Sequence, residues 1–171
     1  MQVRDFEALC GFCTLGEISA ELTSHPELRR CVGDALAAGL GRAVGADAAL
    51  QRVALQAAFT ALMTCDAAVY EAASRKLYDR LTARSAGARS SKESLFIRIF
   101  EQYPGDVGTL SVFFLNHVQL APGEAIYLAA NEPHAYLSGE LIEAMASSDN
   151  VIRAGLTPKL RDTGVRCSAL L

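Results

Sequence analysis

A polar stretch between His134 and Lys159 holds most of the groups in the last third of the chain that could do chemistry. It combines an imidazole, two carboxylates, a guanidinium and an ammonium group between apolar runs and Gly/Pro turns: His134, Glu143, Asp149, Arg153 and Lys159. Such a set can supply a metal ligand, a proton carrier and a fixed cation for developing negative charge. A site that acts on an anionic sugar needs these groups, so the stretch predicts a site of that kind.

Each of these residues also has an ordinary structural explanation. A single histidine such as His134 is more often structural or exposed than a metal ligand. Asp149 lies in the polar run Ser147–Asn150, where an Asp commonly forms a turn. Arg153 has apolar neighbours on both sides, which makes a merely solvated role less natural. Residue types and spacing therefore leave two candidate proton carriers, Glu143 first and Asp149 second.

The first part of the chain, residues 1–105, has the pattern of a helical region. Apolar residues recur at steps of three and four in several segments. Pro26 is predicted to lie in the first turn of a helix, since proline favours that position. The other predicted helical segments are Phe6–Cys13, Glu17–Ser24, Leu50–Cys65, Val69–Leu81 and Leu95–Tyr103.

Glycines and a polar run are predicted to separate these helices. Gly39, Gly41 and Gly45 are expected to break up the segment after Pro26. Residues 85–92 have the composition of a polar loop. The two alanine-rich helices, 50–65 and 69–81, are expected to pack closely against each other because small side chains allow a close approach.

After Asp106 the apolar period changes from that of a helix to that of a strand. Short strands separated by Gly/Pro turns are typical of a small barrel or a double-sheet jelly roll. Glu143 would lie in one of these strands, where desolvation would raise its pKa. Five strands are few to close a barrel, so further segments are expected to complete it. The predicted strands are Leu110–Leu120, Ala125–Ala130, His134–Leu137, Leu141–Ala146 and Val151–Ala154.

The composition argues against a nucleic-acid or membrane partner and favours a reducing cellular compartment. The net charge of −3 gives no reason to expect nucleic acid or an anionic membrane as a partner. No apolar run reaches the roughly 18 residues of a membrane span. Five cysteines, an odd number without a secretory leader, favour a reducing compartment, so a cytoplasmic location is expected. Cys10 and Cys13 have C-x-x-C spacing, but without a second such pair they are interpreted as structural.

The block from His134 to Lys159 resembles the type I phosphomannose isomerases. It matches that family's run H-A-Y-x-x-G…E-x-M-A-x-S-D-N-x-x-R-A-G-x-T-P-K at every fixed position. Shorter pieces agree in the same order along the chain, so the resemblance covers nearly all of it: Phe6–Phe12, Tyr103–Asp106, Pro122–Ala125 and Asn131–His134.

The resemblance implies an α+β fold of known plan. Residues 1–105 would be the helical insertion domain, and residues 106–171 would be returning strands of a cupin-type β domain, a double-stranded β-helix or jelly roll. The family's early metal motifs and its C-terminal β domain would be missing, so the chain is expected to be an internal fragment of a longer enzyme. Such enzymes interconvert mannose 6-phosphate and fructose 6-phosphate, which places them in carbohydrate metabolism and the formation of GDP-mannose.

The resemblance also implies roles for the candidate residues. His134 would be one of four ligands of a catalytic Zn²⁺, the others being a Gln, a His and a Glu from the early motifs. Arg153 would stabilise the negative charge of a cis-enediol intermediate, and Glu143 or Asp149 would carry the proton between C1 and C2. Tyr136 would share the strand face of His134 and bind substrate. Lys159 would contact substrate oxygens or cap the turn after Pro158.

Two further hypotheses remain beside an isomerase segment. The chain could be a non-catalytic helical and β module that binds a partner or a sugar phosphate, or a truncated product without function. With one zinc ligand of four, the isolated chain is expected to be inactive and to bind zinc weakly. An upstream reading frame encoding the early metal motifs would favour the enzyme.

Overall fold

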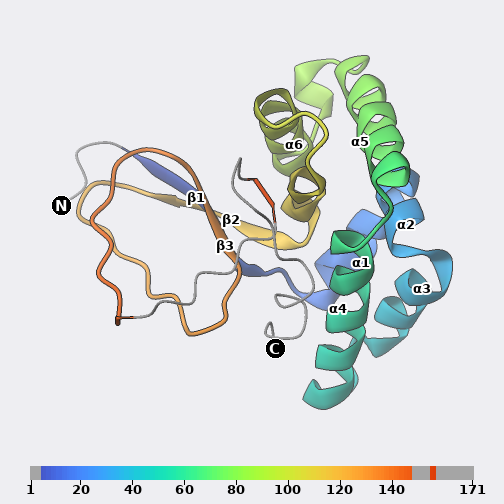
Figure 1. Ribbon diagram of the computed structural model, residues 1–171, viewed down its shortest axis with the longest axis horizontal. Coiled ribbons are helices and arrows are strands. Elements are labelled where there is room, and N and C mark those ends of the chain that lie inside the picture. The colour runs from blue at the N-terminus through green and yellow to red at the C-terminus, as the bar shows by residue number, and fades with distance from the viewer. Residues whose placement is uncertain (1–4, 148–154, 157–171) are drawn as a thin grey trace.

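The computed structural model describes residues 5–147 and 155–156 of the chain. The elements in chain order are β1 (Phe6–Phe12), α1 (Leu15–Ser24), α2 (Pro26–Val32), α3 (Asp34–Ala43), α4 (Ala48–Met63), α5 (Ala67–Thr82), η1 (Ala86–Ala88), α6 (Ser91–Gln102), η2 (Val107–Phe113), β2 (Leu115–Leu120) and β3 (His134–Ser138). The helices gather on one side of the molecule and the strands on the other (Figure 1). The α+β class predicted from the sequence is confirmed.

Strand β1 is the centre of the antiparallel sheet, whose order among the described residues is β2-β1-β3. The prediction of a helix over Phe6–Cys13 is therefore wrong. Alternate residues of β1 pack on opposite faces: Phe6, Ala8 and Cys10 form a small cluster, while Leu9 joins the main core. Because both faces are buried, the strand lacks the apolar–polar alternation that usually identifies one, and its spacing also fits a helix.

A bulge at Gly11 bends the end of β1. The pairing register between β1 and β2 shifts between Leu9 and Phe12, and Gly11 has a φ of 66°. Its N–H donates to the carbonyl of Pro133 at 2.9 Å, just before β3. A Cβ at this position would lie 2.4 Å from Oε1 of Glu132. The positive φ favours glycine here, whereas the close contact is with the end of the flexible Glu132 side chain, which can move.

The helical layer is built from two packed pairs rather than from the pair predicted. Helix α3 packs against α4 and α2 packs against α5. The axes of α4 and α5 are bent by 94° at the short break between them, so the prediction that these two alanine-rich helices pack along each other is wrong. Asp66 begins α5 after the break by accepting from the N–H of Ala68. Each helix therefore directs its apolar stripe to a different neighbour.

Two of the glycines expected to break the chain lie inside helix α3. Gly39 and Gly41 are both helical, and the chain turns with positive φ at Gly45. A Cβ on Gly41 would lie 3.2 Å from Oγ of Ser19 in α1. The absence of a side chain at Gly41 therefore allows α1 and α3 to approach closely, which explains a glycine that would otherwise weaken the helix.

Local sequence features explain the starts of helices α2 and α6. Pro26 is the first residue of α2, as predicted. The predicted loop at residues 85–92 contains η1 and ends at Ser90, which begins α6 with a capping box: Glu93 N–H donates to Ser90 Oγ, and Ser90 N–H donates to a Glu93 carboxylate oxygen. Reciprocal capping satisfies backbone donors that a helix start would leave unpaired.

The predicted strands after Asp106 are confirmed in part. Residues Val107–Phe113 form the buried 3₁₀ helix η2, so strand structure begins later than predicted, with β2 at Leu115. Strand β3 confirms the prediction for His134–Leu137. The strands predicted for Ala125–Ala130 and Leu141–Ala146 are wrong, because both segments lack regular structure.

The missing strands lack pairing partners. In the described part of the chain β2 and β3 form the two edges of the sheet, so no further strand pairs beyond them. An apolar run becomes a strand when a neighbour accepts its hydrogen bonds, and sequence pattern does not show whether one is present. The segment Val151–Ala154 lies outside the described residues. A cupin-type continuation of the sheet, and the division of the chain into domains at residue 105, stay predictions.

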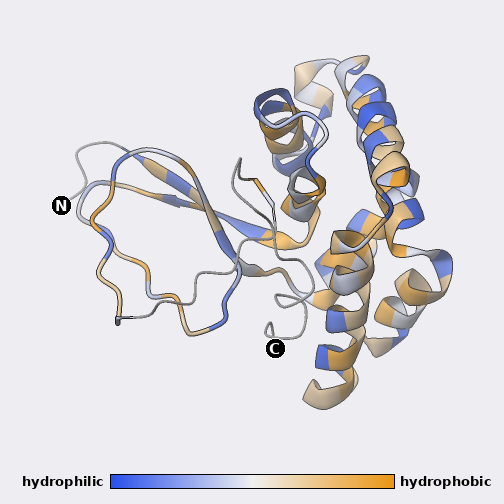
Figure 2. Ribbon diagram, viewed as in Figure 1, coloured by the Kyte–Doolittle hydropathy of each residue, from blue (hydrophilic) through white to orange (hydrophobic). Residues whose placement is uncertain are grey.

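Hydrophobic and hydrophilic residues alternate along the helices, the pattern of helices with one buried face (Figure 2). Among residues 5–147 and 155–156, no single helix is long and apolar enough to cross a membrane. Helices α4 and α5 taken together reach the required length and composition, but with the 94° bend between them.

Candidate functional site

Strand β3 presents His134 and Tyr136 on one face of the sheet. The register of the strands places His134 opposite Cys10 and Tyr136 opposite Ala8. The ring centroids of His134 and Tyr136 are 5.5 Å apart, and the Tyr136 ring meets Phe6 edge-on at 5.4 Å. The prediction that the two residues share a strand face is therefore confirmed by their geometry.

The backbone fixes how His134 presents its imidazole. Its Nδ1 lies 2.9 Å from the carbonyl oxygen of Glu132. Because a carbonyl can only accept, Nδ1 carries the proton in this contact, and Nε2 of the neutral ring keeps its lone pair. The side chain is exposed. A histidine oriented in this way through its second nitrogen is suited to bind a metal.

Tyr136 and Glu143 form a hydrogen-bonded pair across the end of β3. The Tyr136 hydroxyl donates to Oε1 of Glu143 at 2.6 Å. Burial and this carboxylate together raise the pKa of Tyr136 above its ordinary value. Glu143 itself is exposed and lies outside any strand, so the prediction of a desolvated strand carboxylate is wrong. The structure nevertheless brings the predicted proton carrier to the predicted substrate-binding residue.

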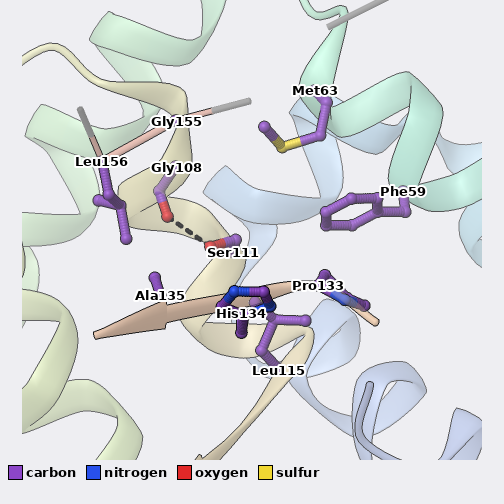
Figure 3. A pocket seen from close by; sticks show the side chains of 10 residues that line it. All are labelled: Phe59, Met63, Gly108, Ser111, Leu115, Pro133, His134, Ala135, Gly155 and Leu156. Atoms are coloured by element: carbon purple, nitrogen blue, oxygen red, sulfur yellow. Dashed lines mark hydrogen bonds between the residues drawn. The ribbon is translucent and has the colours of Figure 1, made fainter. Parts of the chain in front are cut away.

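A small pocket adjoins His134. It is lined by residues of α4, η2, the start of β2, β3 with the residue before it, and the segment 155–156: Phe59, Met63, Gly108, Ser111, Leu115, Pro133, His134, Ala135, Gly155 and Leu156. Figure 3 shows His134 and Ala135 on one side of this pocket and Gly155 with Leu156 on the other. The Ser111 hydroxyl donates to the Gly108 carbonyl at 2.6 Å, which leaves the lining largely apolar around the imidazole.

Asp106 connects two distant parts of this pocket wall. Its Oδ1 accepts from the N–H of Gly108 at 2.7 Å and begins η2, and its Oδ2 accepts from the N–H of Leu156 at 3.1 Å. The second of these bonds was not predicted from the sequence. An Asp two residues before a glycine signals a local cap, but nothing local signals a partner fifty residues later.

Three of the predicted site residues lie outside the described part of the chain. These are Asp149, Arg153 and Lys159. Their predicted roles stay predictions. The described neighbours Gly155 and Leu156 show where the chain that follows Arg153 runs.

The described residues do not form a zinc site by themselves. Among them, no group of three or more His, Cys, Asp or Glu side chains is placed to hold a metal ion. His134 fits as one ligand by its orientation, and a catalytic zinc site takes about three protein ligands. The other ligands would have to come from outside the described residues.

The C-x-x-C pair has the structural character expected of it. Cys10 packs in the small cluster on one face of β1, and Cys13 joins the main core. Burial raises the pKa of both thiols. Lys92 Nζ lies 3.0 Å from the Cys13 sulfur. The two thiols belong to different clusters, which argues against a joint redox or metal role.

A polar cluster centred on Glu7 lies apart from the pocket and ties the sheet to α6. Its carboxylate accepts from Arg98 of α6 at 2.6 Å, contacts His117 Nε2 of β2 at 2.7 Å and accepts from Ser138 of β3 at 3.1 Å. Burial raises the pKa of Glu7, but these bonds more than offset it, so the pKa lies below its ordinary value. The cluster explains His117, which the sequence left without a role.

Known proteins similar to this chain are isomerases. It is 44% identical over 166 residues to mannose-6-phosphate isomerase 1 of Arabidopsis thaliana, an alignment that covers 96% of this chain and 38% of that protein. It is 38% identical over 168 residues to the mannose-6-phosphate isomerase of Homo sapiens, with 96% and 40% covered. The chain thus spans about two fifths of the length of these relatives.

The solved structures that are similar to this chain are also phosphomannose isomerases. The chain matches mannose 6-phosphate isomerase from Salmonella typhimurium, bound to substrate (F6P) and a zinc atom, with a TM-score of 0.74 and 30% identity over 100% of this chain and 40% of that one. The apo form of the same enzyme gives a TM-score of 0.74 at 30% identity, with the same coverage. The family model for the phosphomannose isomerase type I helical insertion domain matches residues 31–115. By sequence and by structure, the chain is similar to a part of the type I phosphomannose isomerases.

Proposed function

We propose that this chain is the part of a zinc-dependent mannose-6-phosphate isomerase that carries its late metal ligand and its proton-transfer residues. The observation that carries the proposal is the arrangement on β3. His134 is oriented by Glu132 to offer Nε2, and two residues away Tyr136 holds Glu143 by a 2.6 Å hydrogen bond. The substrate follows from the names of the relatives, and fructose 6-phosphate would be the product.

Glu143 is suited to move a proton between adjacent carbons. Aldose–ketose isomerisation through a cis-enediol needs one base that takes a proton from one carbon and returns it to the next. The Tyr136 hydroxyl occupies Oε1 of Glu143 and leaves Oε2 able to accept. The carboxylate is exposed, so a substrate can reach it. Asp149 is kept as the second candidate for this role.

The remaining roles concern charge. Arg153 would face the enediolate oxygens, where its planar guanidinium can contact two oxygens together. Lys159 would bind substrate oxygens. A zinc ion held by His134 and by ligands from the rest of the protein would polarise the sugar carbonyl. We place the protein in the cytoplasm, a proposal supported by its odd number of cysteines.

The decisive experiment replaces the matching segment of the Arabidopsis isomerase with this chain and measures turnover of mannose 6-phosphate and bound zinc. An active chimera supports the proposal, because the exchanged segment then supplies every residue assigned above. A chimera that folds and binds zinc but does not turn over would contradict it and favour a non-catalytic module. The chain alone serves as the negative control.

In the active chimera, Arg153→Ala should lower kcat by roughly 10²–10³, or about 3–4 kcal/mol, with little change in KM. The charge it stabilises appears only during the reaction, which is why kcat carries the loss. Arg153→Lys should recover little. Arg42→Ala, an exposed arginine in the last turn of α3, is the matched control and should leave both constants unchanged. A tenfold rise in KM at constant kcat would make Arg153 a substrate-binding residue instead.

A further inference from the structure

The Asp106 carboxylate holds together two backbone segments that are far apart in the chain. Oδ1 accepts from Gly108 N–H at 2.7 Å and Oδ2 accepts from Leu156 N–H at 3.1 Å. Each oxygen has its own partner. We propose that Asp106 is a positioning residue, which fixes the segment following Arg153 against η2 and beside His134.

The contact between the two segments is made without side chains between them. A Cβ on Gly155 would lie 2.8 Å from the Cα of Gly108, and a Cβ on Gly108 would lie 2.8 Å from the backbone nitrogen of Leu156. Real Cβ atoms do not approach other atoms this closely. Glycine at both positions therefore allows the backbone of residues 155–156 to lie directly on η2.

The backbone at Leu156 needs such a restraint. Its φ is 54°, a left-handed conformation that disfavours residues with a Cβ. The hydrogen bond from its N–H to a charged carboxylate is of the stronger kind. Asp106 thus stabilises a conformation that Leu156 would not adopt on its own.

The hydrogen bond from Leu156 N–H to Asp106, called the anchor below, lies beside the candidate site. Gly155 and Leu156 line the same pocket as His134. Arg153 precedes Gly155 by two residues, so chain connectivity alone keeps its Cα within roughly 7 Å of that of Gly155. Fixing residues 155–156 therefore restricts where the guanidinium can act. The assignment of Arg153 as the group to be placed rests on the proposed function.

Trypsin provides a test on the chain itself, since it cleaves after Arg153. Asp106→Asn keeps the size of the side chain but replaces one acceptor oxygen by an amide donor. It should speed cleavage of the Arg153–Ala154 bond about tenfold, the fold-change for losing one hydrogen bond to a charged group. Hydrogen exchange at the Leu156 amide should rise with it.

Asp47→Asn is the matched control. A single oxygen of Asp47 accepts both the Ala49 and Leu50 N–H groups at 3.0 Å, so an Asn there keeps both bonds. Gly155→Ala disturbs the same contact without touching the carboxylate and should also speed cleavage. If both variants are cleaved at the rate of wild type and of Asp47→Asn, the anchor is refuted. If circular dichroism shows that Asp106→Asn has lost helicity, the cleavage rate of Gly155→Ala alone decides whether the anchor exists.

The chimera separates this proposal from the proposed function. There Asp106→Asn should lower kcat at least tenfold while KM and bound zinc stay unchanged, a split that general destabilisation would not produce. An inactive parent chimera with normal trypsin results would refute the isomerase assignment and leave the anchor standing. An active chimera whose kcat is insensitive to Asp106→Asn would refute the positioning role.

Discussion

The helical layer and the sheet differ in how completely their charged side chains are paired and their apolar side chains are buried. In the helical layer buried charges have partners: Glu27 pairs with Arg80 at 2.9 Å, and Glu93 pairs with Arg84 at 2.7 Å. Large apolar side chains are exposed in both regions, up to 63% at Val53 of α4, but the most exposed ones lie around the sheet: Tyr127 at 87%, Ile142 at 76% and Met145 at 75%. The helices close a core, whereas the described strands and loops do not.

This difference indicates where stability and where function lie in the chain. The main core includes residues from every α-helix and from η2. The predicted site residues that the structure describes are exposed and lie on β3 or in the irregular segment after it. Functional groups commonly lie on less stable segments that a rigid scaffold positions. Two pairs of substitutions, each with one member in the helical layer and one near the sheet, test this comparison. A third pair, within the helical layer, tests the pH dependence of its stability.

The largest difference is expected between Leu77→Ala and Ile142→Ala. Leu77 in α5 is fully buried, so its truncation should lower the free energy of unfolding by about 2–5 kcal/mol. Ile142 is mostly exposed, so its truncation should change that free energy by less than about 0.5 kcal/mol. Urea unfolding followed by circular dichroism measures both. Similar losses from the two variants would show that the loop after β3 is packed as firmly as the helices.

A smaller difference is expected between two glycines with similar positive φ. Gly33 between α2 and α3 and Gly139 after β3 have φ values of 91° and 96°. Alanine at Gly33 meets open space and should cost roughly 1–3 kcal/mol for the backbone conformation alone, because φ of 91° with ψ of 142° is sparsely populated by residues with a Cβ. Alanine at Gly139 adds a Cβ 2.4 Å from the Asp5 carbonyl oxygen, which should cost about 1–3 kcal/mol more.

Thermal unfolding of the two variants separates conformation from contact. A larger loss for Gly139→Ala than for Gly33→Ala would show that the close approach of residues 5–6 to Gly139 contributes to the stability of the chain. Equal losses would mean that residues 5–6 move away from the new Cβ at position 139 without loss of stability. The sheet would then be more easily deformed than the helical layer.

The smallest effect concerns pH and the buried His25. Although burial opposes it, hydrogen bonds and charge from Glu21 and Glu93 raise the pKa of His25 above its ordinary value. A raised pKa adds stability that is complete below the unfolded pKa of about 6.5 and is lost as the pH rises through the folded value. Stability should therefore fall by at most about 1.4 kcal/mol per pH unit above this point.

His25→Gln should flatten this slope, measured as the free energy of unfolding between pH 6 and pH 9. Arg84 also contacts the Glu93 carboxylate, and that pair does not depend on the imidazole, so it should persist in this variant. Ile18→Val, which removes one buried methylene, is the control for general destabilisation and should keep the wild-type slope. A slope that is unchanged in His25→Gln would assign the pH dependence to another group.

Features decided by neighbouring residues could be predicted from the sequence. Pro26 at a helix start and the strand around His134 and Tyr136 follow from local conformational preference and alternation. The resemblance of the last third to a family block identified His134 and Glu143, and the structure places Tyr136 against both.

Features decided by distant residues could not be predicted. β1 was mistaken for a helix because its partners, β2 and β3, begin more than a hundred residues later. The bend between α4 and α5 and the bond from Asp106 to Leu156 likewise depend on contacts across the fold. Glu143 was expected in a strand because its apolar neighbours fit one, but a strand also needs a partner to accept its hydrogen bonds.

The central position of β1 has a consequence for synthesis on the ribosome. Strand β1 is made before its partners β2 and β3, which follow only after about 100 further residues, roughly 5–20 s at ordinary translation rates. The helices between them make short-range contacts that form as soon as the chain emerges. During that interval both edges of Phe6–Phe12 lack the partners that they have in the described sheet, and unpaired strand edges of this kind are prone to aggregation.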